Sequence, residues 1–180
     1  MSGSREPKIH ISGNDYISCF FNKGELTCLN SMQASPEFKN FFKELGNSTD
    51  VESHMELAEL YVCRLYGVTK FKRVNEARYF IFHTKESKNI SVDLSLLPPC
   101  KSVLYLHLSR AIYIANLWKQ SLTAMVGLPE ISEFGWNPDG SIVWVEECFP
   151  AEVEDIMDDL FSNTDNNDIS YESDVDSEQE

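Results

Sequence analysis

The stretch Leu97–Leu122, "LPPCKSVLYLHLSRAIYIANLWKQSL", decides the fold class of this chain. After the proline pair, apolar side chains recur at alternating steps of four and three residues from Leu104 to Leu122. Further apolar residues widen this stripe to nearly the full circumference, which is typical of a helix buried on most of its surface. We therefore predict a helix over about 101–122 at the centre of a helical core.

The flanking sequence predicts shorter helices around this one. Ser35 before Pro36 is typical of a helix start, and Asp50 is placed to cap a helix that runs to Tyr66 and ends at Gly67. Apolar residues at helical spacing predict three further helices, over 26–32, over 74–84 and from Pro150 onward. Residues 141–146 follow a turn and are predicted to form a short strand or extended segment. The expected fold class is mainly α.

Length and charge predict one domain with a charged tail. The chain has 180 residues, of which 42% are hydrophobic, enough for one domain with a buried core. Twelve acids and no Lys or Arg lie between residues 152 and 180, which leaves 17 of the 29 acids against 15 bases in the body. We expect a disordered lead over 1–8, a helical domain over 9–161 and a disordered acidic tail over 162–180.

The composition also limits the cellular compartment and the classes of partner that we expect for this protein. The five cysteines are scattered without a C-x-x-C pair, as in reduced intracellular proteins, and we expect most of them to be buried. The absence of a long apolar run and of a targeting segment predicts a nuclear or cytoplasmic protein rather than a secreted or membrane protein. The nearly neutral body argues against strong nonspecific nucleic-acid binding, which draws on clustered Lys and Arg.

Asp15, in "ISGNDYISCFFNKGE" (residues 11–25), fits two roles. An aspartate after Gly-Asn is an ordinary helix cap, here for a helix over 16–21 that ends at 22–24. The alternative is a metal ligand, but hard divalent cations are held by several carboxylates. No other aspartate forms a recognisable pair with Asp15, so the cap is the favoured interpretation.

Two more residues of this stretch are candidate phosphate ligands. Lys23 and Gly24 follow an aromatic pair, and an ammonium group with backbone N–H groups near a helix end suits a phosphate. A glycine that ends a helix is the alternative from spacing alone. His107 and the tryptophans Trp118, Trp136 and Trp144 are expected to be core residues and turn anchors.

The tail contains two candidate phosphorylation sites. Ser173 and Ser177 are each followed three residues later by an acid, the pattern that acidophilic kinases favour. Added phosphates would extend an existing negative block and could dock a basic protein partner. The alternative is a solvating tail that keeps the protein dispersed.

Four segments resemble a large family of animal proteins associated with mobile elements. They are "SGNDYISCFFNKGE", "LYGVTKFKRVNEARYFIF", "DLSLLPPCKSVLYLHLSRAIYIANLWKQSL" and "GWNPDGSIVWVEECFPAEVEDIM". The resemblance covers nearly all of residues 9–160. Longer members carry an upstream nuclease core similar to PIN and flap-endonuclease domains. By this fold-level analogy Asp15 would be the last acidic ligand of Mg²⁺ or Mn²⁺, and Lys23 with Gly24 would begin a segment that contacts the DNA backbone.

The chain departs from the family pattern around Asp15. Asn14 replaces the usual Cys, and Asn22 and Glu25 replace residues of a Gly-Lys-Gly-Lys motif, with loss of positive charge. The resemblance implies a noncatalytic C-terminal helical part of a transposon-derived PIN-like protein, in a truncated or degenerate copy. The rival hypotheses are a protein–protein interaction module with a phosphorylatable acidic tail and a metal-dependent nuclease that the missing upstream acids of the family would complete.

Overall fold

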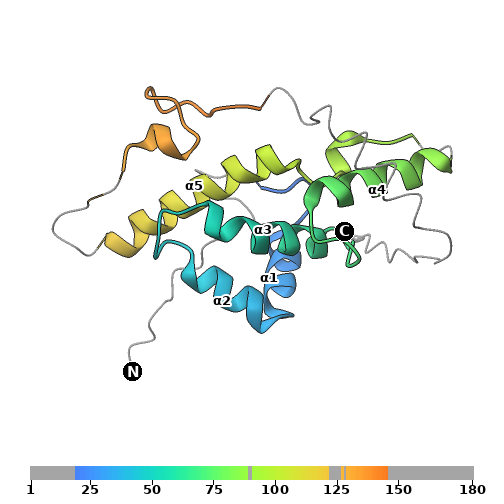
Figure 1. Cartoon of the computed structure of the whole chain (residues 1–180), viewed down its shortest axis with the longest axis horizontal. Coiled ribbons are helices and arrows are strands. Elements are labelled where there is room, and N and C mark those ends of the chain that lie inside the picture. Colours follow the sequence, from blue (N-terminus) through green and yellow to red (C-terminus); the bar gives the residue numbers. More distant parts are fainter. Residues whose placement is uncertain (1–18, 89–90, 122–126, 128, 146–180) are drawn as a thin grey trace, which may run out of the picture. The chain divides into compact units, whose positions relative to one another are not determined.

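The computed structural model describes residues 19–88, 91–121, 127 and 129–145, and these residues are mainly helical (Figure 1). Their only β pairing is an isolated antiparallel bridge between Trp136 and Ile142, so the described residues of the segment predicted over 141–146 form no strand. The mainly α fold class is confirmed. The α-helices are α1 (Glu25–Gln33), α2 (Pro36–Glu44), α3 (Glu52–Leu65), α4 (Val74–Ser87) and α5 (Lys101–Gln120), with 3₁₀ turns η1 (Leu94–Leu96) and η2 (Ile131–Phe134).

Helix ends follow the predicted caps. The Ser35 hydroxyl accepts a hydrogen bond from the Glu37 N–H at 3.2 Å, at the start of α2. The Asp50 carboxylate accepts from the Ser53 N–H at 3.3 Å, in the first turn of α3. The prediction of a helix over 16–21 is wrong where it is described: residues 19 and 20 are not helical and Phe21 begins a turn, while residues 16–18 lie outside the described part.

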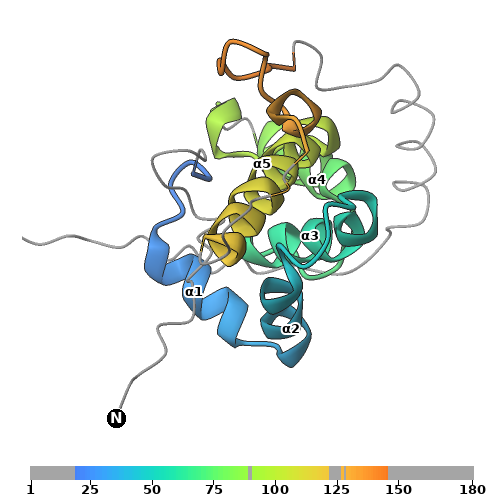
Figure 2. The same cartoon turned by 90° about the vertical axis from the view of Figure 1, so that its left-hand side faces the viewer.

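α3 shares the centre of the core with α5, because it packs against α1, α2, α4 and α5 (Figure 2). The Tyr61 ring of α3 meets Phe38 and Phe42 of α2 edge-on, with ring centroids 5.4 and 5.0 Å apart. Its hydroxyl donates to the Cys28 carbonyl of α1 at 2.9 Å. One buried side chain therefore joins three helices, with its polar end satisfied.

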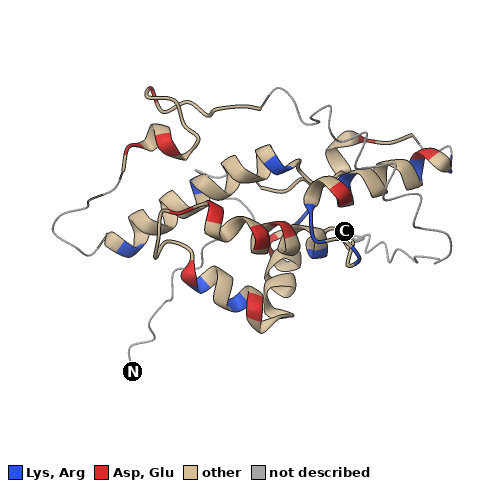
Figure 3. Cartoon of the chain, in the orientation of Figure 1, with Lys and Arg blue, Asp and Glu red and all other residues tan. Residues whose placement is uncertain are grey.

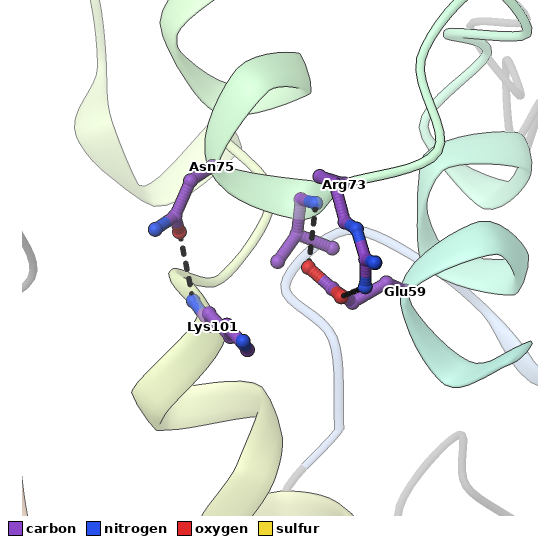
Figure 4. Close-up of polar contacts among 5 residues, drawn as sticks. Glu59, Arg73, Asn75 and Lys101 are labelled. Atoms are coloured by element: carbon purple, nitrogen blue, oxygen red, sulfur yellow. Dashed lines mark hydrogen bonds and ion pairs between the residues drawn. The ribbon is translucent and has the colours of Figure 1, made fainter. Parts of the chain in front are cut away.

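Side chains of one helix cap the next (Figure 4). The Glu59 carboxylate of α3 accepts from the Val74 N–H at 3.2 Å, and from the Arg73 guanidinium at 2.7 Å. The Asn75 amide oxygen of α4 accepts from the Lys101 N–H at 2.9 Å, at the start of α5. The first N–H groups of a helix have no intrahelical partner, so these contacts fix where α4 and α5 begin.

The segment 131–145 is held to α5 by a buried arginine. The Arg110 side chain donates to the Gly135 carbonyl from Nε at 3.1 Å and from Nη2 at 2.9 Å, and to the Val143 carbonyl at 2.7 Å. Trp136 is buried beside it, as predicted for a turn anchor. Trp144 is 79% exposed, so its prediction as an anchor is wrong.

Candidate nucleic-acid interface

Positive charge gathers where α3 ends and the chain turns into α4. Residues 64–73 contain Arg64, Lys70, Lys72 and Arg73 and no acid. Figure 3 shows this connection in blue, whereas the preceding turns of α3 carry red. The arrangement suits the helix dipole, since cations are favoured at a helix C-terminus.

Three of these four cations are free of carboxylate partners in the described part of the chain. Arg73 forms an ion pair with the buried Glu59 carboxylate at 2.7 Å, so its charge is used within the fold. Arg64, Lys70 and Lys72 are exposed and form no ion pair with a described carboxylate. Within the described residues, no ion pair neutralises their charge.

Lys23 adds a fourth cation from a distant part of the sequence. Its ammonium lies 4.7 Å from the centroid of the Tyr66 ring, in the connection between Arg64 and Lys70. Attraction to the face of an aromatic ring holds the ammonium there. We call Lys23, Arg64, Lys70 and Lys72 the basic surface.

The Lys23 side chain is partly buried, which affects its charge. Burial lowers the pKa of Lys23, because desolvation disfavours its charged form. Burial also raises the pKa of Tyr66 to about 12, so the ring stays neutral in the physiological range. A neutral, electron-rich face against a partly desolvated ammonium fixes the Lys23 side chain in place.

Gly24 begins a helix and does not end one, so the prediction of a C-terminal glycine is wrong. It is the N-cap of α1, with φ −66° and ψ 162°, and its carbonyl accepts from the Cys28 N–H at 3.1 Å. The N–H groups of the first turn of α1 therefore follow Lys23 directly along the chain. Whether Lys23 and Gly24 contact phosphate stays a prediction.

The described residues do not assemble a metal centre. Within residues 19–88, 91–121, 127 and 129–145, no group of three or more His, Cys, Asp or Glu side chains is placed to hold an ion. Asp15, the ligand that the family resemblance implies for Mg²⁺ or Mn²⁺, lies outside these residues, as do Ser173 and Ser177. The roles predicted for these three residues stay predictions.

Other candidates from the sequence have structural roles. His107 is buried, with its ring 4.8 Å from that of Phe20. Cys28, Cys63 and Cys100 are buried, as expected for most of the cysteines. In the described part of the chain, no helix combines the length and apolar character needed to cross a membrane.

Sequence reasoning missed Arg64, Lys70 and Lys72 because it averaged charge over the whole body. A ten-residue window over 64–73 would have shown four bases and no acid. The approach of Lys23 to this window has no sequence signal, since about forty residues separate the two segments. Comparisons of the chain with family models, curated proteins and solved structures give no match.

Proposed function

We propose that this chain is a noncatalytic helical module of a nuclease-like protein, and that its basic surface contacts the phosphate backbone of a nucleic acid. The observation that carries the proposal is the placement of four cations at one end of α3 without a described carboxylate partner. Lysine and arginine contacts to phosphates supply most of the affinity of sequence-independent binding. The resemblance of residues 9–160 to a family with a nuclease core supports the same class of ligand.

The acidity of the whole chain does not prevent such binding. The formal charge is −14, but interactions between exposed charges are screened over about 8 Å at physiological ionic strength. The binding of a phosphate at the basic surface therefore depends mainly on the charges within about one screening length of it. The remaining acids make the binding weaker and more dependent on salt.

The number of cations that contact phosphates predicts how steeply the binding affinity falls with salt concentration. Four phosphate contacts would give a slope of log affinity against log salt of about −3 for a single strand. Loss of one cation should reduce the slope by about 0.7. A protein–protein contact of mainly apolar character would not show this relationship.

A charge-reversal pair tests the proposal on the full chain. Fluorescence anisotropy should show that Lys70→Glu with Lys72→Glu weakens the binding of a labelled oligonucleotide and flattens its salt dependence. The matched control is Lys39→Glu with Lys43→Glu on α2, which changes the net charge equally at two exposed lysines. Equal weakening by both pairs, or no binding at low salt, would overturn the proposal.

A further inference from the structure

One member of an adjacent aromatic pair is exposed to solvent, two residues before Lys23 of the basic surface. Phe20 is 6% exposed and packs on His107, whereas Phe21 is 57% exposed. The turn that carries Phe21 is closed by the Lys23 N–H, which donates to the Phe20 carbonyl at 3.1 Å. The buried ring anchors the turn, so the Phe21 ring stands on a fixed support.

The backbone conformation of the turn accounts for the exposure of Phe21. Asn22 has φ 56°, in the left-handed region that Asn tolerates better than most residues. This conformation reverses the chain between Phe21 and Lys23 and lets the two side chains follow different paths. Lys23 goes to the Tyr66 ring, while Phe21 remains in solvent.

Proteins that bind single-stranded nucleic acid combine exposed aromatic rings with cations, and here an exposed ring precedes Lys23 by two residues in the same turn. Such sites pair a positive groove along the backbone with aromatic side chains on which bases stack. Bases in a duplex already stack on one another, so their faces are not open to a side chain on the surface. From this combination at Phe21 and Lys23 we infer that the ligand is a single strand, one unpaired base of which stacks on the Phe21 ring.

An acidic peptide with apolar side chains could also bind the cations of the basic surface. The exposed apolar side chains near Lys23 nevertheless favour a nucleobase as the ligand. A helical peptide is held by several apolar contacts at positions i, i+3, i+4 and i+7 in a groove. Among the described residues, the large exposed apolar side chains of this part of the sequence are Phe21 and Leu26, at 57% and 69%. A single flat ring on a turn suits one base, and stacking tolerates any base.

Two ligands with equal numbers of phosphates test this inference, which rests on the proposed function. The probes are labelled oligodeoxythymidylate and an abasic oligonucleotide of the same length. Phe21→Ala should weaken oligodeoxythymidylate binding about tenfold, the loss expected for one stacked base, and leave the abasic strand unchanged. Phe21→Trp should restore affinity, with quenching of the new indole when the oligonucleotide binds.

Control variants separate the possible outcomes. Trp144→Ala removes another exposed aromatic side chain, 79% exposed, and should not affect either ligand. Equal affinity of both ligands for the wild type, with no effect of Phe21→Ala, would overturn the stacking site and leave the phosphate contact intact. Absence of binding to both ligands would overturn the proposed function together with this inference. Tighter binding of an acidic amphipathic peptide through Phe21 would reassign the surface to a protein partner.

Discussion

The buried carboxylate of Glu59 accepts the first backbone N–H of α4, that of Val74, at 3.2 Å. The same carboxylate pairs with Arg73, so the connection that presents the basic surface is tied to α3 at its final residue. The cations at 64–72 therefore stand on a segment fixed at both ends, first by α3 and then by this contact. A fixed segment loses less conformational entropy when it binds a ligand.

Removal of the Arg73 side chain should destabilise the fold more than its exposure suggests. Glu59 has a side chain only 1% exposed, and Arg73→Ala would leave its charge buried with one N–H as partner. Breaking a buried pair in this way costs about 3 kcal/mol, which urea unfolding would measure. Glu59→Gln keeps an oxygen acceptor for the Val74 N–H and should cost about 1–2 kcal/mol. Lys72→Ala is the exposed control, and a result for Arg73→Ala equal to this control would contradict the prediction.

Gly46 should tolerate no side chain, because its backbone touches α5. Its φ is +81°, and a Cβ would lie 2.7 Å from the backbone carbon of Ala115. Gly46→Ala should lower the free energy of unfolding by about 3 kcal/mol, measured in urea. Gly67→Ala has a similar φ of +74° but open space around it, so it should cost only about 1 kcal/mol. Equal losses in the two variants would show that the contact with α5 carries no cost.

Arg110→Met should loosen segment 131–145 before it unfolds the helices. The variant leaves the Val143 carbonyl without the Arg110 donor and the Gly135 carbonyl with only the Val143 N–H, at a cost of about 2 kcal/mol. Hydrogen exchange should quicken at the Val143 N–H, which donates to the Gly135 carbonyl at 3.0 Å, while the amides of α3 keep their protection. Uniform acceleration across α3 would instead mean that the segment and the helices unfold together.

Stability should fall as pH rises above about 9, partly through Cys63. Burial raises the pKa of this thiol to about 12, from an ordinary value of about 9. Between these two values the unfolded chain binds fewer protons than the folded protein, so unfolding becomes more favourable as pH rises. The slope from one such group approaches 1.4 kcal/mol per pH unit. Urea titrations at several pH values measure it.

Cys63→Ala should flatten this pH profile, because the variant has no thiol proton at position 63. Val62→Ala is the packing control: it deletes atoms from a neighbouring buried side chain and should lower stability by the same amount at each pH. A Cys63→Ala profile parallel to that of the wild type would assign the alkaline loss to other groups. Tyr61, whose pKa burial raises, would then be the next residue to test.

The sequence predicted local features well, because their causes lie within a few residues. The Ser35 cap, the Asp50 cap and the Gly67 terminus each depend on backbone groups one turn away, and all three occur in the structure. The apolar stripe of α5 likewise follows from a period that the sequence contains. The helix predicted over 16–21 is absent where the structure describes it: residues 19 and 20 are not helical, and a turn with Asn22 at φ 56° follows them directly.

The candidate site was predicted only in part. Lys23 could be named from the sequence because it follows an aromatic pair and precedes a glycine. Its neighbours Arg64, Lys70 and Lys72 could be found as a local run of charge, but no pattern joins that run to Lys23. The exposure of Phe21 against the burial of Phe20 depends on which ring meets His107 across the fold.

The amino-acid sequence by itself determined the helical fold class and most helix boundaries, because hydrogen bonds and apolar spacing within one helix act over a few residues. The tertiary structure alone decided that Glu59 caps α4, that Asn75 caps α5 and that Gly46 meets Ala115. It also brought Lys23 to Tyr66. These contacts join residues that are distant in the chain, and only the packing of the complete core selects them.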